Sequence, residues 1–153
     1  RAPFYSPDAR AGFIGISPHT TRAELQRAVF EGLAFAIVDA LQGYPQGGEL
    51  NLTGGGAASA TWLQIIADCT GRTVVSSAFN ELSARGAAIL AARSVAALAE
   101  TPPLAQTRYQ PRPQAHARYA ALYPVYRLLR EQMLPVWQAR QAALQPLSQD
   151  LQP

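Results

Sequence analysis

The chain has 153 residues, of which 48% are hydrophobic and 15% are charged, and its formal net charge at pH 7 is +3. This composition is typical of one globular domain and excludes a disordered chain. No apolar run approaches the roughly 20 residues of a membrane-spanning helix, and no charged-then-apolar leader opens the sequence. We therefore expect a soluble, cytoplasmic protein that makes no membrane contact.

The number and placement of the basic, cysteine and histidine residues argue against several kinds of site. The 13 basic residues are all arginine and are scattered from Arg1 to Arg140, whereas a nucleic-acid-binding face would gather them. We therefore expect no nucleic-acid partner. The single cysteine, Cys69, excludes a disulfide framework, and its helical surroundings predict a buried thiol. The two histidines stand far apart without an acidic cluster, so we expect no metal site.

A short strand and a long helix are predicted first. The apolar segment FIGIS at residues 13–17 predicts a strand. Thr21, with Glu24 three residues later, forms a capping box, which is a signal for the start of a helix. Apolar residues then recur at steps of three and four, so we expect this helix to reach about Leu41. The glycines and proline at 43–48 predict a turn.

Strands and helices alternate in the middle of the chain. The pattern predicts a strand at 49–53, a glycine turn at 54–56, a helix at 57–69 closed by Gly71, a strand at 73–77 and a helix at 83–99. This alternation indicates the α/β class.

The composition changes after residue 100. Residues 101–114 form a proline-rich connector, and residues 115–145 show apolar and aromatic side chains at helical spacing. This segment predicts an amphipathic helix that packs on the domain, and Pro124 and Pro135 can kink or break it. Residues 146–153 are expected to be a frayed tail.

The three consecutive glycines need an explanation, because each loses conformational entropy when the chain folds. A strand, a glycine-rich turn and a helix N-terminus together offer backbone N–H groups to an anion. The run also resembles a loose dinucleotide-binding fingerprint, but that fingerprint needs an acidic residue at the end of the next strand, and here the strand ends in Ser77. A Walker loop would need Gly-Lys-Ser, which does not follow.

Two stretches resemble signatures of the FGGY family of carbohydrate kinases. Residues 11–31, AGFIGISPHTTRAELQRAVFE, fill every position of the second signature of that family. Residues 52–74, LTGGGAASATWLQIIADCTGRTV, are similar to its adenosine motif and to the helix and strand after it. Residues 80–92 resemble the helix that follows. The resemblance runs in register over residues 1–130 and is closest to the xylulokinase branch, on Pro3, Phe4 and Asp8.

This resemblance implies a fold and a nucleotide site. The family has two domains of the actin and ribonuclease-H type, and residues 1–100 would be the later part of the C-terminal, nucleotide-binding domain. The expected fold is thus a partial ribonuclease-H/actin-like ATPase domain with a C-terminal helical tail. The cofactors implied are ATP and Mg²⁺. The nucleotide-binding residues implied are Gly54, Gly55, Gly56, Ala57 and Ala60. Ala60 stands where some relatives carry an asparagine that reaches the purine, so adenine would be held by shape and backbone.

The reaction implied is transfer of the ATP γ-phosphate to a ketopentose hydroxyl, most closely D-xylulose to xylulose 5-phosphate. Ribulose, gluconate, glycerol or erythritol as substrate stays open, as does a non-catalytic module that binds a nucleotide or a partner. The catalytic aspartate of the family precedes this segment, so no catalytic residue is expected here and the chain alone should be inactive. Its partners would be the N-terminal part of the same kinase, the nucleotide and, through that part, the sugar.

Self-association is a further expectation. The predicted strands at 13–17, 49–53 and 73–77 would form only part of a sheet, and an unpaired strand edge tends to pair with another chain.

Overall fold

The structure is a computed structural model, and it describes residues 6–45, 47–77, 81–95 and 104–149. The described chain forms two compact units. One contains residues 44–116, and the other contains the described parts of residues 1–43 and 117–153. Arg1, Pro3, Phe4 and the end of the helix predicted to reach residue 99 lie outside the described residues.

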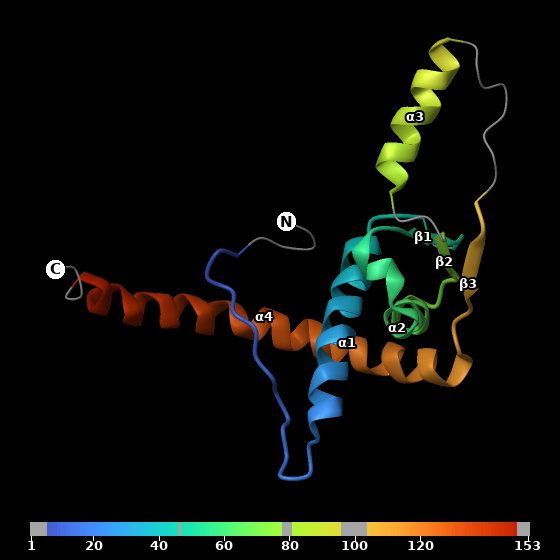
Figure 1. Cartoon of the computed structure of the whole chain (residues 1–153). Helices are drawn as coiled ribbons and strands as arrows, with labels where there is room; N and C mark the ends of the chain where they lie inside the picture. Colours follow the sequence, from blue (N-terminus) through green and yellow to red (C-terminus); the bar gives the residue numbers. More distant parts are fainter. Residues whose placement is uncertain (1–5, 46, 78–80, 96–103, 150–153) are drawn as a thin grey trace. The chain divides into compact units, whose positions relative to one another are not determined.

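The central unit is built on a small mixed sheet in the order β1-β2-β3 (Figure 1). Strand β1 (Leu50–Leu52) pairs in parallel with β2 (Val74–Ser77), and β2 pairs antiparallel with β3 (Gln106–Tyr109). Between β1 and β2 the chain forms a short 3₁₀ turn, η1 (Gly55–Ala58), and helix α2 (Ala60–Thr70). The predicted strand–turn–helix–strand order is confirmed. Helix α3 (Leu82–Ser94) follows β2.

Helix α2 supplies most of the core of this unit. Its apolar side chains at Leu63, Ile65, Ile66 and Cys69 are at most 6% exposed, and so are Val74 and Val75 on β2. The predicted burial of Cys69 is confirmed. The helix ends at Gly71, whose left-handed φ of +67° suits a residue without a Cβ. An L side chain at position 71 would also meet the His116 ring at 2.6 Å.

Two expectations about strands are wrong. Residues 13–17 form no strand: Gly15 has a φ of +82°, which interrupts an extended backbone, and the side chains of Phe13, Ile14 and Ile16 are 49%, 64% and 58% exposed. The segment 101–114, expected to be only a connector, also contains a strand, so that β2 is paired with β1 on one side and with β3 on the other. Strand β3 has the sequence Gln-Thr-Arg-Tyr and is mostly exposed. It lacks the alternation of apolar and polar residues from which a strand is predicted.

The second unit brings two helices together through aromatic side chains. Helix α1 (Arg22–Leu41) begins at the predicted capping box, with Thr21 and Glu24 each bonded to the backbone N–H of the other. Helix α4 (Pro113–Gln149) enters this unit from residue 117. Phe35 of α1 is 8% exposed and contacts three tyrosine rings of α4, with centroid distances of 5.2 to 6.0 Å: Tyr119, Tyr123 and Tyr126. The expected docking of the helical tail is confirmed within this unit.

Helix α4 is longer and less interrupted than predicted. It is one helix through Pro124 and Pro135, and it includes residues 146–149 of the expected frayed tail. Proline removes a backbone hydrogen bond and crowds the preceding turn, yet the tyrosine contacts lie on both sides of Pro124 and stabilise the helix there. None of the helices in the described ranges is long and apolar enough to cross a membrane.

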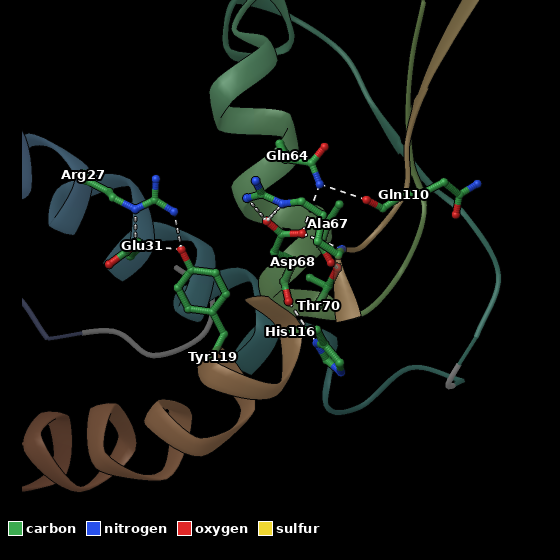
Figure 2. A network of polar contacts seen from close by, with 10 residues as sticks. Arg27, Glu31, Gln64, Ala67, Asp68, Thr70, Gln110, His116 and Tyr119 are labelled. Carbon is green, nitrogen blue, oxygen red and sulfur yellow. Dashed lines mark hydrogen bonds and ion pairs between the residues drawn. The ribbon is translucent and has the colours of Figure 1, made fainter. Parts of the chain in front are cut away.

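Polar contacts flank the aromatic cluster. Arg27 donates through Nε to Glu31 Oε1 at 2.7 Å and through Nη2 to the Tyr119 hydroxyl oxygen at 2.8 Å (Figure 2). The Tyr119 hydroxyl in turn donates to Glu31 Oε1 at 2.7 Å. Burial, together with the bond to Glu31, raises the pKa of Tyr119 to about 12. Burial and a bond to Asp39 raise the pKa of Tyr123 to about 12 as well.

These raised pKa values predict an alkaline loss of stability. A group whose pKa is higher in the folded state stabilises the fold fully below its unfolded pKa, here 10, and loses that contribution as the pH rises towards 12. The free energy of unfolding should therefore fall between pH 10 and 12. Urea titrations across this range would measure it. In the double variant Tyr119→Phe/Tyr123→Phe the free energy of unfolding should fall less over this pH range. An identical fall would show that these two tyrosines do not cause the loss of stability.

Candidate functional site

The candidate site is the turn that connects β1 to α2. The backbone leaves β1 through Gly54 and forms η1, in which the Ala57 N–H donates to the Gly54 carbonyl oxygen at 3.0 Å. Ser59 then caps α2, since its side-chain oxygen accepts the Trp62 N–H at 3.3 Å. The helix therefore begins at Ala60, three residues later than predicted, because the 3₁₀ turn occupies the positions before it.

The five predicted nucleotide-binding residues all lie on this turn or at the start of α2. Gly54, Gly55, Gly56 and Ala60 are exposed, and Ala57 is half-buried. Ala60 is the first residue of α2. The predicted residues thus share one accessible piece of backbone, which is the geometry that a ligand lying against the chain requires.

The three glycines are needed for different reasons. Gly54 has φ +86° and ψ −172°, a conformation that is essentially restricted to glycine, so it shapes the turn. Gly56 faces α2, and a Cβ there would lie 3.4 Å from Trp62 Nε1, an ordinary contact distance. Gly55 has no left-handed φ, and a Cβ added to it would meet no atom within 4 Å. The fold of the described chain therefore accounts for Gly54 but gives no reason for Gly55.

A second polar cluster lies at the other end of α2 and has to be weighed as a site. The Asp68 carboxylate is 0% exposed and accepts bonds from the Arg112 backbone N–H at 2.8 Å and from its Nε and Nη2 at 3.1 and 2.5 Å. Gln64 donates to Asp68 Oδ1 at 3.0 Å and to the Gln110 carbonyl oxygen at 2.9 Å (Figure 2). His116 Nδ1 lies 2.9 Å from the Asp68 carbonyl oxygen.

This cluster is structural. Burial acts to raise the pKa of Asp68, but the hydrogen bonds from Arg112 and Gln64 and the Arg112 charge outweigh it and hold that pKa below its usual value. An ionised carboxylate whose oxygens already accept several bonds within the chain has little capacity left for a substrate. Among the described residues, no three His, Cys, Asp or Glu side chains gather as a metal site.

A family model that covers both the turn and the elements around it defines the class of protein. The family model for the FGGY family of carbohydrate kinases, C-terminal domain, matches residues 1–95, which is more than half of the chain. The chain therefore belongs to the FGGY family of carbohydrate kinases, as the resemblance of the two signatures predicted.

The individual relatives are kinases named after different substrates. The chain is 32% identical over 142 residues to the xylulose kinase of Staphylococcus epidermidis, covering 86% of this chain and 29% of that protein. It is 35% identical over 147 residues to the erythritol kinase of Brucella abortus, covering 90% of this chain and 28% of that protein. The chain thus spans less than a third of the length of these relatives.

Solved structures show the same fold. The ligand-bound xylulose kinase of Lactobacillus acidophilus aligns with a TM-score of 0.80 at 24% identity, over 91% of this chain and 30% of that one. The xylulose kinase of Rhodospirillum rubrum aligns with a TM-score of 0.72 at 28% identity, over 86% and 28%. The predicted class, an α/β domain of the actin-like ATPase type, is confirmed.

Proposed function

We propose that this chain forms the nucleotide-binding part of an ATP-dependent sugar kinase. The reaction is transfer of the ATP γ-phosphate to a hydroxyl of a ketopentose, D-xylulose to xylulose 5-phosphate. Membership of the carbohydrate kinase family supports the reaction class, and the xylulose kinases among its relatives support the sugar. The observation that carries the site is the space beside Gly55, where an added Cβ would meet no atom within 4 Å. The chain's own fold therefore does not explain why this residue is glycine.

The residues of the turn would bind and orient the nucleotide. Gly55 and Gly56 would lie against the adenosine and the α-phosphate, because a backbone without Cβ atoms permits close approach. Ala57 and Ala60 would line the same side, and an alanine at position 60 leaves adenine held by shape and backbone. When bound, ATP supplies the phosphoryl group and Mg²⁺ neutralises charge on its phosphates. No residue of this chain is assigned to the metal.

The chain would contribute one wall of the active site. Phosphoryl transfer needs a phosphate clamp, a metal and a positioned hydroxyl together. The family's aspartate general base belongs to a segment outside residues 1–153, so this chain alone would not phosphorylate a sugar. The remainder of the kinase would supply the base and the sugar site.

Other substrates are alternatives, because some relatives are named as kinases of other substrates. An erythritol kinase is 35% identical and a glycerol kinase of Koribacter versatilis is 36% identical. A solved gluconate kinase also aligns, with a TM-score of 0.76 and 25% identity. A non-catalytic module that binds only a nucleotide or a partner is the alternative of another class.

The experiment is a substrate panel on the full-length kinase. ATP consumption is measured with D-xylulose, L-xylulose, D-ribulose, gluconate, glycerol and erythritol. We expect the highest kcat/KM with D-xylulose. A clear preference for another sugar of the panel would correct the substrate, and ATP turnover with none of them would favour the non-catalytic module.

Gly54 and Gly55 form a matched pair for testing the site. Gly54→Ala should lower the free energy of unfolding by about 1–3 kcal/mol, because alanine rarely adopts this conformation. Gly55→Ala should leave stability unchanged but raise the KM for ATP, because the methyl group occupies space that the ligand would use. Thermal denaturation and ATP kinetics measure the two effects, with Gly86→Ala, which also meets no atom within 4 Å, as control. An unchanged KM in Gly55→Ala would contradict the nucleotide assignment.

A further inference from the structure

A buried serine ties the glycine turn to the neighbouring strand. Ser76 lies on β2, where the parallel register sets it opposite Leu52, the last residue of β1. Its hydroxyl donates a hydrogen bond to the Ala57 carbonyl oxygen at 3.3 Å. This bond joins the strand beside β1 to the turn that directly follows β1.

Burial alone does not explain a hydroxyl at position 76. Val74 and Val75 before it are 0% and 2% exposed, and Ser76 is 7% exposed. A buried hydroxyl costs free energy unless it forms a hydrogen bond, and alanine would fill nearly the same space without that cost. The Ala57 carbonyl oxygen offsets the cost, so the position is suited to holding the turn.

Helix α2 bounds the turn as well. A Cβ at Gly56 would lie 3.4 Å from Trp62 Nε1 and 3.6 Å from its Cδ1. The backbone N–H of Trp62 donates to the Ser59 side-chain oxygen at 3.3 Å, which fixes the first turn of α2. The Gly56 carbonyl oxygen accepts the backbone N–H of Ser59, the N-cap of α2, at 3.3 Å. Gly56 is therefore bonded to the start of α2, and Ala57 to β2.

We infer that Ser76 is a positioning residue for nucleotide binding, acting through the Ala57 carbonyl group. This inference rests on the proposed function. Because Ala57 follows Gly55 and Gly56 within one short turn, a shift of its carbonyl group moves the backbone that would meet the nucleotide. The bond from β2 fixes that backbone before any ligand arrives, which lowers the ordering cost of binding.

The test uses the full-length kinase and the variant Ser76→Ala. Loss of one hydrogen bond that orders a site should raise the KM for ATP by about three- to tenfold. ADP affinity, measured by calorimetry without sugar, should weaken by the same factor, while kcat and the KM for sugar stay unchanged. Ser76→Thr keeps the hydroxyl and should restore ADP affinity. The control is Ser94→Ala, which removes the 2.7 Å bond from an exposed serine to the Ala91 carbonyl oxygen in α3.

Three outcomes would overturn the inference. The first is unchanged ADP affinity in Ser76→Ala. The second is an equal rise of both KM values with a lower melting temperature, which would mean that Ser76 only supports the fold. The third is a wild-type kinase that neither binds ADP nor consumes ATP. That result overturns the proposed function together with the role of Ser76, and the wild-type measurement identifies it before any variant is made.

Discussion

Replacing Asp68 with alanine should lower the free energy of unfolding by about 3 kcal/mol. The carboxylate is fully buried and accepts bonds from the Arg112 backbone N–H, the Arg112 guanidinium and the Gln64 amide. Its removal takes a fully buried acceptor away from the Arg112 backbone N–H and from the side chains of Arg112 and Gln64, and it disconnects α2 from the start of α4. Urea denaturation followed by circular dichroism would measure the change.

An exposed pair of the same chemistry provides the control. Arg108 donates to both carboxylate oxygens of Glu49 at 3.0 and 3.1 Å, but these side chains are 51% and 44% exposed. Exposed ion pairs contribute little, so Glu49→Ala should barely move the urea midpoint. Equal effects of the two substitutions would show that burial of Asp68 does not decide its contribution.

The Asp68 contribution should also depend on pH. Its pKa is lower in the folded state than the usual value of 3.8, so its stabilisation is complete above that value. It is lost as the pH falls through the folded pKa.

Replacing Gly56 with valine in the full-length kinase should raise the KM for ATP by about tenfold or more and leave the KM for sugar nearly unchanged. A Cβ at this position already reaches contact distance with Trp62, so the two further methyl groups must displace the indole ring or enter the space assigned to the nucleotide. Steady-state kinetics with each substrate varied in turn would measure this split.

The control for this variant is Gly86→Val. Gly86 lies on α3, and a Cβ there meets no atom within 4 Å, so the same substitution adds the same bulk away from the turn. A rise of both KM values in Gly56→Val would indicate a general distortion of the domain. An unaltered dependence on ATP would count against nucleotide contact at Gly56.

Local signals in the sequence predicted much of the fold. The capping box located the start of α1, and the apolar runs on either side of the glycines located β1 and β2. These elements depend on residues a few positions apart. The wrong predictions concern the pairing of strands that are far apart in the sequence. The segment 13–17 has the composition of a strand but pairs with no strand in the described chain, whereas β3, which is polar, is a strand through its pairing with β2.

The candidate site shows the same difference between local features, which the sequence predicts, and long-range contacts, which it does not. The glycines are contiguous, so the sequence alone identified the turn that they form. Ser76 was missed because its bond to Ala57 spans 19 residues of sequence, and Trp62 because an aromatic residue on a helix is usually part of the core. One signal could have found Ser76: a serine directly after two valines in a buried strand needs a hydrogen-bond acceptor.

The close approach of His116 to Gly71 has an evolutionary consequence. Two constraints act at position 71: the left-handed backbone, which asparagine can adopt at modest cost, and the imidazole ring, which occupies the space of any side chain. Only the second constraint depends on another residue. Homologues that carry asparagine at position 71 should therefore carry a small residue at position 116. The two positions should covary, although they lie 45 positions apart in the sequence.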